Sequence, residues 1–101
     1  MGFLSSIVDG MGKAVADQFY PYYREACRQD SRTLCSYIEN ETNNTRKVIC
    51  ILALSTKDSY KTKEYYRQYQ AICNNQFATL RKTPRFATDI DMFMRKIGSG
   101  Y

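Results

Sequence analysis

Apolar residues recur at helical spacing along almost the whole chain, and this pattern limits the fold more than any other feature of the sequence. Near the N-terminus they stand at every fourth position: Phe3, Ile7, Met11, Val15 and Phe19. Such a repeat lines one face of an amphipathic helix. The most hydrophobic segment, residues 48–54, fits either a buried helix or a buried strand, but the sequence offers no second strand for it to pair with. We therefore predict an all-α fold.

The N-terminal half should contain an amphipathic helix over about 1–20 that ends near Pro21, because proline breaks or kinks a helix or else begins a new one. A second helix is expected to run to about residue 39, with Asp30-Ser31 as an alternative starting point for a separate piece. Residues 40–45 are rich in Asn and Thr, whose side chains compete with helical hydrogen bonds, so this segment should be a loop.

The C-terminal half should begin with a buried helix over residues 48–54, which we place at the centre of the core. A longer helix is expected over about 59–81. A final helix should start near Thr88, with Asp91 completing a capping motif, and should stop at Gly98. About four helices would thus form a small hairpin or bundle.

From its 101 residues we expect a single helical domain. We divide it into an N-terminal arm (1–20), a helical core (21–81) and a C-terminal helix with its tail (82–101).

The cysteines, Cys27, Cys35, Cys50 and Cys73, are open to two interpretations. They pair as disulfides in an oxidising compartment and act as small core residues in a reducing one. Cys35 and Cys50 are equally far from the middle of the 40–45 loop, so two antiparallel helices would bring them to the same level. A Cys35–Cys50 disulfide is therefore the pairing that we expect if one forms.

Several function classes are disfavoured by residue type. The chain has no histidine, so its cysteines lack the usual general base, and its Asp and Glu residues form no paired-carboxylate pattern. The cysteine spacings are also unlike those of zinc sites. We predict no catalytic residue, no metal ion and no cofactor.

Tyrosines and basic residues point instead to binding. Nine of the 101 residues are Tyr, an amino acid enriched at protein interfaces, and the largest cluster comprises Tyr60, Tyr65, Tyr66 and Tyr69. Residues 61–101 hold eight basic and three acidic side chains, a surplus of five, which equals the net charge of the whole chain. The densest basic patch is Arg81, Lys82 and Arg85, which favours an acidic protein or an anionic lipid headgroup as partner, unless it is only a solvated helix face.

The N-terminus matches the N-myristoylation pattern, with Gly2 as the acceptor. The first twenty residues lack the basic start of a signal peptide and are too short and polar to span a bilayer, so no transmembrane segment is predicted. Asn40 and Asn43 begin two glycosylation sequons, which we interpret as chance matches.

Together these features predict a non-catalytic structural or accessory subunit of a large multiprotein assembly, with other protein subunits as its main partners. The expected setting is a respiratory-type complex, peripheral to the mitochondrial inner membrane, and otherwise the cytoplasm. A small basic nucleic-acid-binding module is the alternative, because Tyr side chains near Lys and Arg are able to stack on bases while the cations hold phosphates.

Overall fold

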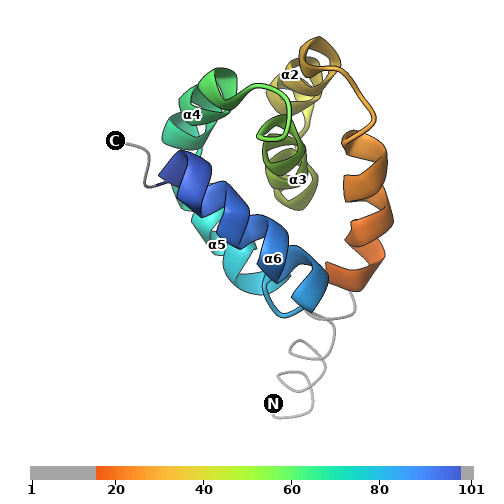
Figure 1. The fold of residues 1–101 in the computed structure, drawn as a ribbon. Helices are drawn as coiled ribbons and strands as arrows, with labels where there is room; N and C mark the ends of the chain where they lie inside the picture. The colour runs from red at the N-terminus through yellow and green to blue at the C-terminus, as the bar shows by residue number, and fades with distance from the viewer. Residues whose placement is uncertain (1–15, 99–101) are drawn as a thin grey trace.

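The computed structural model describes residues 16–98, and this part of the chain contains helices and no strands (Figure 1). The predicted all-α class is therefore confirmed. The number of helices is larger than predicted, because the described residues form six α-helices, the last of which continues into a π-helical turn. They are 16–26, α2 (Ser31–Asn40), α3 (Asn44–Leu54), α4 (Ser59–Gln68), α5 (Gln70–Leu80), α6 (Pro84–Phe93) and the π-helical turn η1 (Met94–Gly98).

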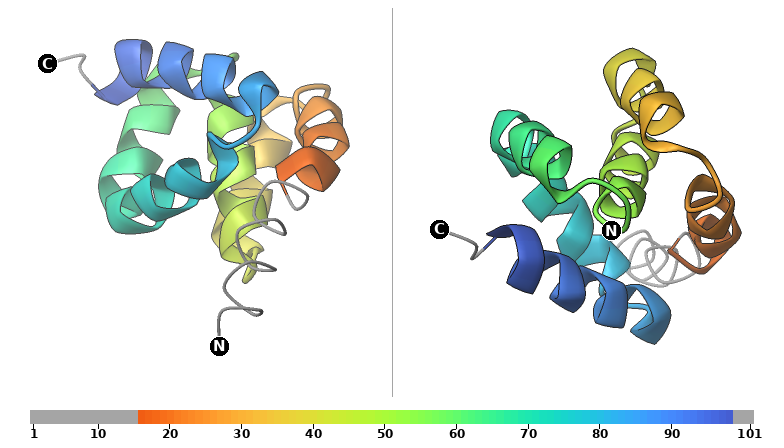
Figure 2. Two further views of the ribbon diagram at one scale, coloured as in Figure 1. Left: turned by 90° about the horizontal axis from the view of Figure 1, so that it is seen from below. Right: turned by 45° about the horizontal axis from the view of Figure 1, so that its top comes forward.

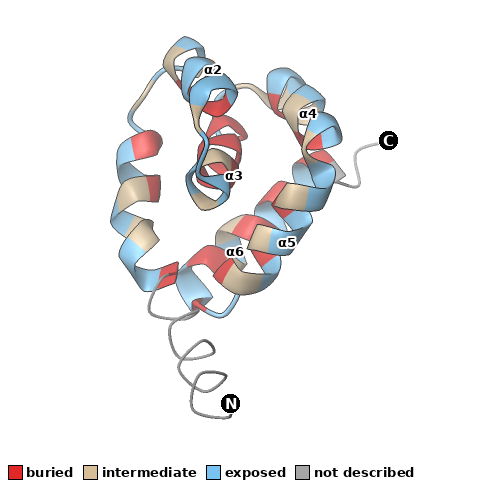
Figure 3. Cartoon of the chain, turned by 180° about the vertical axis from the view of Figure 1, so that it is seen from behind, coloured by how far each residue is buried: buried red, intermediate tan, exposed pale blue. Residues whose placement is uncertain are grey.

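Helix α3 forms the centre of the core. Every residue from 48 to 54 is at most 1% exposed, which confirms that this run is a buried helix. Two views show α3 between the 16–26 helix on one side and α4 with α5 on the other (Figure 2). Helix α3 is buried along most of its length, and the surrounding helices carry exposed residues on their outer faces (Figure 3). Each buried Leu or Ile side chain contributes roughly 1.5–3 kcal/mol.

Three helices begin at side-chain caps, where an oxygen accepts a backbone N–H that the first helical turn leaves unpaired. The distances are 2.7 Å from Asp30 Oδ1 to Thr33 N, 3.0 Å from Asn43 Oδ1 to Arg46 N and 3.0 Å from Asp58 Oδ1 to Lys61 N. The alternative start at Asp30-Ser31 is thus confirmed, since α2 is separate from the helix before it. The connection at 41–43 falls within the predicted loop and folds α3 back along α2 (Figure 1).

The single helix predicted over 59–81 is wrong, because Tyr69 divides it into α4 and α5. The backbone of Tyr69 has φ −114° and ψ 29°, outside the helical region. The two helices then follow different directions around α3 (Figure 1). The change of direction keeps both Tyr66 of α4 and Phe77 of α5 buried, with 6% and 2% exposure.

The predicted start of the last helix near Thr88 is also wrong. α6 begins at Pro84, where proline's missing N–H costs nothing because the first-turn N–H groups have no helical partner. Thr88 lies inside the helix, and its hydroxyl donates to the Pro84 carbonyl over 3.4 Å. The earlier start places Phe86 in the core with no exposed surface.

Pro21 does not end a helix, contrary to the prediction, because residues 16–26 are helical through it. A proline inside a helix costs about 3 kcal/mol. Aromatic packing on Phe86 offsets this cost, with ring-centre distances of 5.2 Å to Tyr20 and 5.6 Å to Tyr23. Within 16–98, none of the helices is long and apolar enough to cross a membrane.

Candidate functional site

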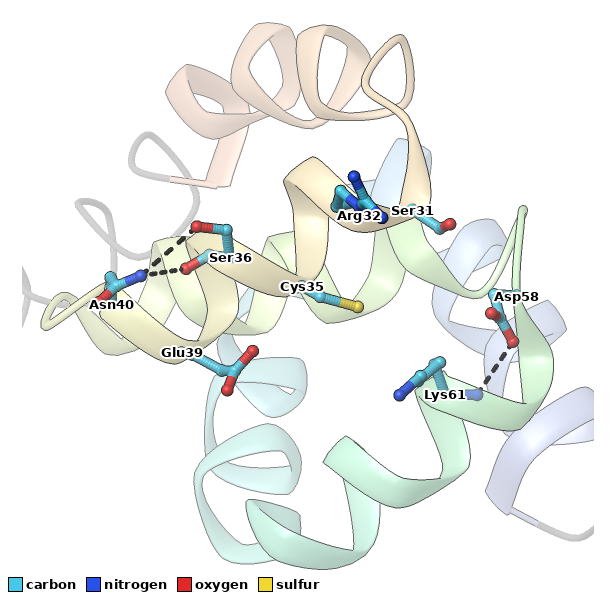
Figure 4. A pocket seen from close by; sticks show the side chains of 8 residues that line it. All are labelled: Ser31, Arg32, Cys35, Ser36, Glu39, Asn40, Asp58 and Lys61. Carbon is cyan, nitrogen blue, oxygen red and sulfur yellow. Dashed lines mark hydrogen bonds between the residues drawn. The ribbon is translucent and has the colours of Figure 1, made fainter.

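An open groove of about 570 Å³ separates α2 from α4 (Figure 4). Its α2 wall follows the helical repeat, because residues three and four positions apart share a face. The lining side chains are Ser31, Arg32, Cys35, Ser36, Glu39 and Asn40 from α2, with Asp58 and Lys61 from the start of α4.

The groove carries charges of both signs in equal number. Arg32 and Lys61 supply two positive charges, and Glu39 and Asp58 supply two negative ones. Among the described residues, neither cation has a carboxylate oxygen within 4.0 Å. These two cations are therefore available to a ligand or partner.

Tyr65 lies beside the groove and connects its two helices. Its hydroxyl donates to Glu39 Oε2 over 3.0 Å. Burial raises the pKa of Tyr65 above its ordinary value, and hydrogen bonds to Cys35 and Glu39 raise it further. Tyr65 is thus a neutral donor at physiological pH that fixes the Glu39 carboxylate in place.

The other side of α2 borders a second, smaller groove of about 230 Å³, toward the 16–26 helix. It is lined by Tyr22, Glu25, Ala26, Gln29, Tyr37 and Glu41. Helix α2 is therefore a ridge between two grooves, and Tyr37 on it is 46% exposed.

The predicted interface tyrosines do not form one surface. Tyr60 is 73% exposed. Tyr66 is buried, and its hydroxyl donates to Asn74 Oδ1 over 2.9 Å. Tyr69 is covered by Lys47, whose Nζ lies 4.3 Å from the ring centre. Tyr60 is therefore the most exposed tyrosine of the predicted cluster. Tyr37, which is also exposed, was not among the predicted interface residues.

The three predicted basic-patch residues lie on and beside the turn between α5 and α6. Arg81 lies 3.6 Å from Asp91, and the Arg85 guanidinium lies 5.2 Å from the centre of the Tyr20 ring. Lys82 is exposed on the same turn. This patch therefore helps to hold the turn in place as well as presenting positive charge.

All four cysteines are free thiols, so the Cys35–Cys50 disulfide is not formed. The prediction placed both residues on facing sides of a hairpin, but Cys35 lines the groove between α2 and α4. Cys50 is buried in α3, where its Sγ makes a 3.5 Å hydrogen bond with the Tyr22 hydroxyl. Cys73 is buried as well, and burial raises its pKa to about 12.

The remaining predicted sites are distributed as follows. Gly2 lies outside the described residues. Asn40 donates from Nδ2 to the Ser36 carbonyl over 2.8 Å, and Asn43 caps α3, so both sequon asparagines make hydrogen bonds within the fold. Within residues 16–98, no three Cys, Asp or Glu side chains are close enough together to hold a metal ion.

Comparison with known proteins gives no relative: no family model, curated protein or solved structure matches this chain. The groove must therefore be interpreted from its own chemistry.

The sequence did not indicate this groove as a site, although Cys35 had been considered as a disulfide partner. The shared face of Arg32, Ser36 and Asn40 was readable from their four-residue spacing. Nothing in that spacing shows that α2 lies beside α4, because α3 separates them in the sequence.

Proposed function

We propose that this chain is a non-catalytic accessory subunit, and that it binds another protein of a larger assembly through α2 and the groove between α2 and α4. The observation that carries the proposal is the pair of cations, Arg32 and Lys61, that face an open groove without an ion-pair partner in the described part of the chain.

The balance of charge favours a protein as the partner. Nucleic acids and anionic lipid surfaces attract proteins through a surplus of positive charge. The groove has no surplus, because Glu39 and Asp58 match Arg32 and Lys61. A polypeptide that carries both acidic and basic side chains is complementary to such a surface.

Exposed tyrosines lie on the two helices that form the groove, although they do not line it. Tyr37 of α2 is 46% exposed and borders the second groove, and Tyr60 of α4 is 73% exposed. Tyrosine is among the residues that contribute most binding energy at interfaces. The nucleic-acid alternative has less support, because Tyr66 and Tyr69 are already packed within the fold and are not available to stack on bases.

For the setting, we propose a respiratory-type assembly on the mitochondrial inner membrane. Small size, a net charge of +5 and the high tyrosine content support this setting by their general resemblance to accessory subunits. Cell fractionation of the endogenous protein tests this part separately, and recovery in the cytosol alone would contradict it.

The binding proposal is tested by the native size of the tagged full chain after mild detergent extraction. The wild type should migrate with a complex many times larger than its own 11.8 kDa. Arg32→Glu reverses one groove charge and should weaken binding by about tenfold or more, which is the typical effect of removing a strong interface contact. The substitution should not harm the fold, since glutamate is favourable near a helix N-terminus.

Arg24→Glu is the matched control, because Arg24 is an exposed arginine of the 16–26 helix, away from the groove. The control should stay in the complex. A wild type that migrates as a free small protein, or equal release of both variants, would contradict the proposal.

A further inference from the structure

A third hollow, a cleft of about 320 Å³, lies on the other side of α4, between α4 and the C-terminal turn η1. It is lined by Lys63, Tyr66, Arg67, Gln70 and Ile97. The positions of the lining residues on α4 show why this cleft is separate from the groove between α2 and α4. Lys61 and Tyr65 share the face of α4 toward α2, whereas Lys63 and Arg67 share the opposite one.

The cleft concentrates positive charge, and none of the described residues that line it is acidic. Lys63 and Arg67 are four residues apart, a spacing that places two side chains next to each other on a helix and makes like charges repel. Neither has a carboxylate within 4.0 Å in the described part of the chain, and Glu64, which lies between them in the sequence, is exposed and pairs with neither. The fold thus holds Lys63 and Arg67 next to each other in the cleft, although their charges repel.

The base of the cleft is apolar and fixed. Ile97 of η1 is 1% exposed and Tyr66 is 6% exposed. The Tyr66 ring packs edge-on against Phe93 at 5.5 Å, and its hydroxyl is bonded to Asn74. Low-polarity walls strengthen the interaction of nearby cations with an anion, because they exclude water from part of the surrounding space.

Gln70 adds a neutral hydrogen-bond donor at the edge of the cleft. It is the first residue of α5, and no side chain caps that helix.

We propose that this cleft binds the dianionic phosphate group of a phosphate monoester. Two cations match two negative charges, whereas a carboxylate would neutralise only one of them. The planar guanidinium of Arg67 is suited to bidentate contact with phosphate oxygens, and Lys63 acts as a point charge beside it. The volume exceeds that of the phosphate itself, which leaves space for part of the molecule that carries it. This site is independent of the protein-binding groove.

Calorimetric titration of the full chain with inorganic phosphate, at constant ionic strength, tests the proposal for soluble phosphates. Flotation with vesicles that contain phosphatidic acid, compared with pure phosphatidylcholine vesicles, tests it for a lipid headgroup. The test variant is Lys63→Gln with Arg67→Gln. The matched control is Arg32→Gln with Lys61→Gln, which removes the same two residue types from the other groove.

In at least one of the two assays, the wild type should bind and the Lys63/Arg67 variant should bind about a hundredfold more weakly, since each charged hydrogen bond that is lost costs roughly tenfold. The control variant should bind like the wild type. Binding to inorganic phosphate identifies a soluble ligand, and binding to vesicles alone identifies a lipid headgroup. No binding in either assay, or an equal loss in both variants, would overturn the proposal.

Glutamine favours helix, and removal of two like charges relieves repulsion, so the test variant should fold. Its thermal midpoint without phosphate should equal or exceed that of the wild type. If inorganic phosphate binds, it should raise the midpoint of the wild type and of the control variant more than that of the test variant.

Discussion

The four thiols differ in how far the fold protects them. Cys50 and Cys73 have no exposed surface, whereas Cys27 and Cys35 are half-buried. Burial raises the pKa of Cys73 to about 12 and raises that of Cys50 as well, although the hydrogen bond between Cys50 and Tyr22 opposes the increase at Cys50. Because the thiolate is the reactive form, both buried residues should be inert in the folded state.

We predict that iodoacetamide at about pH 8 alkylates Cys35 and Cys27 of the folded protein and spares Cys50 and Cys73. Peptide mass spectrometry after a short exposure measures the modification at each site. The same reaction in denaturant should label all four residues, which controls for detection. Labelling of Cys73 as fast as Cys35 under native conditions would contradict the buried position of α5.

Asp30 links the stability of the fold to pH through its role as a cap. The hydrogen bonds from Thr33 lower the pKa of the Asp30 carboxyl below its ordinary value of 3.8. A carboxyl with a lowered pKa in the folded state stabilises the fold above its unfolded pKa, and this contribution is lost as the pH falls through its folded pKa. The loss should therefore occur below about pH 4.

The prediction is that the wild type loses more stability than Asp30→Asn between about pH 6 and pH 2.5. Asparagine keeps the capping oxygen but does not titrate there. Urea midpoints measured at the two pH values give the comparison. An identical loss in both proteins would show that Asp30 contributes nothing to the pH dependence.

Among the helices, α3 begins at a single side-chain cap, Asn43. Asn43→Ala removes the oxygen that accepts the Arg46 N–H and should lower the free energy of unfolding by about 1 kcal/mol. Asn44→Ala is the control, since Asn44 is exposed at the first position of α3 and alanine favours helix. Urea unfolding followed by circular dichroism measures both. Equal effects of the two substitutions would contradict the cap.

The sequence predicted a helix correctly where residues close to one another along the chain determine its start and its burial. Asp30 as a helix start and the buried 48–54 helix follow from capping and hydrophobicity within a few residues, and both were predicted. The break at Tyr69 is different, because the apolar repeat continues through it from Tyr66 to Cys73. The start of α6 at Pro84 was missed because Pro84 fits equally as the end of one helix and as the first residue of the next.

At the scale of the whole molecule, the candidate site depends on topology that the sequence does not contain. The predicted tyrosine cluster assumed one continuous helix, and the break at Tyr69 gives Tyr66 and Tyr69 different surroundings. The groove brings Arg32 and Lys61 together across two helices that are not consecutive. Residue type led to the prediction of a binding surface, and that prediction remains to be tested. The position of the proposed surface follows from the packing of α2 and α4 around α3, which the sequence does not show.

Phe93 connects three of these helices, so it provides the strictest test of the packing. It is 1% exposed on α6, and its ring centre lies 5.5 Å from that of Tyr66 on α4 and 5.2 Å from that of Phe77 on α5. Phe93→Ala should cost about 3–5 kcal/mol, because it removes buried area and leaves a cavity. Small domains are stable by only about 5–15 kcal/mol, so this variant should be largely destabilised.

Phe93→Leu, which keeps most of the volume, should cost clearly less. Met92→Ala is the neighbouring control, since Met92 is 54% exposed and its loss should change stability by less than about 0.5 kcal/mol. Urea unfolding followed by circular dichroism at 222 nm reports all the helices together. If Phe93 joins α4, α5 and α6 into one core, every helix should unfold in a single shifted transition. A separate early transition in Phe93→Ala, with the remaining helices as stable as in the wild type, would mean that α6 packs on a core that is complete without it.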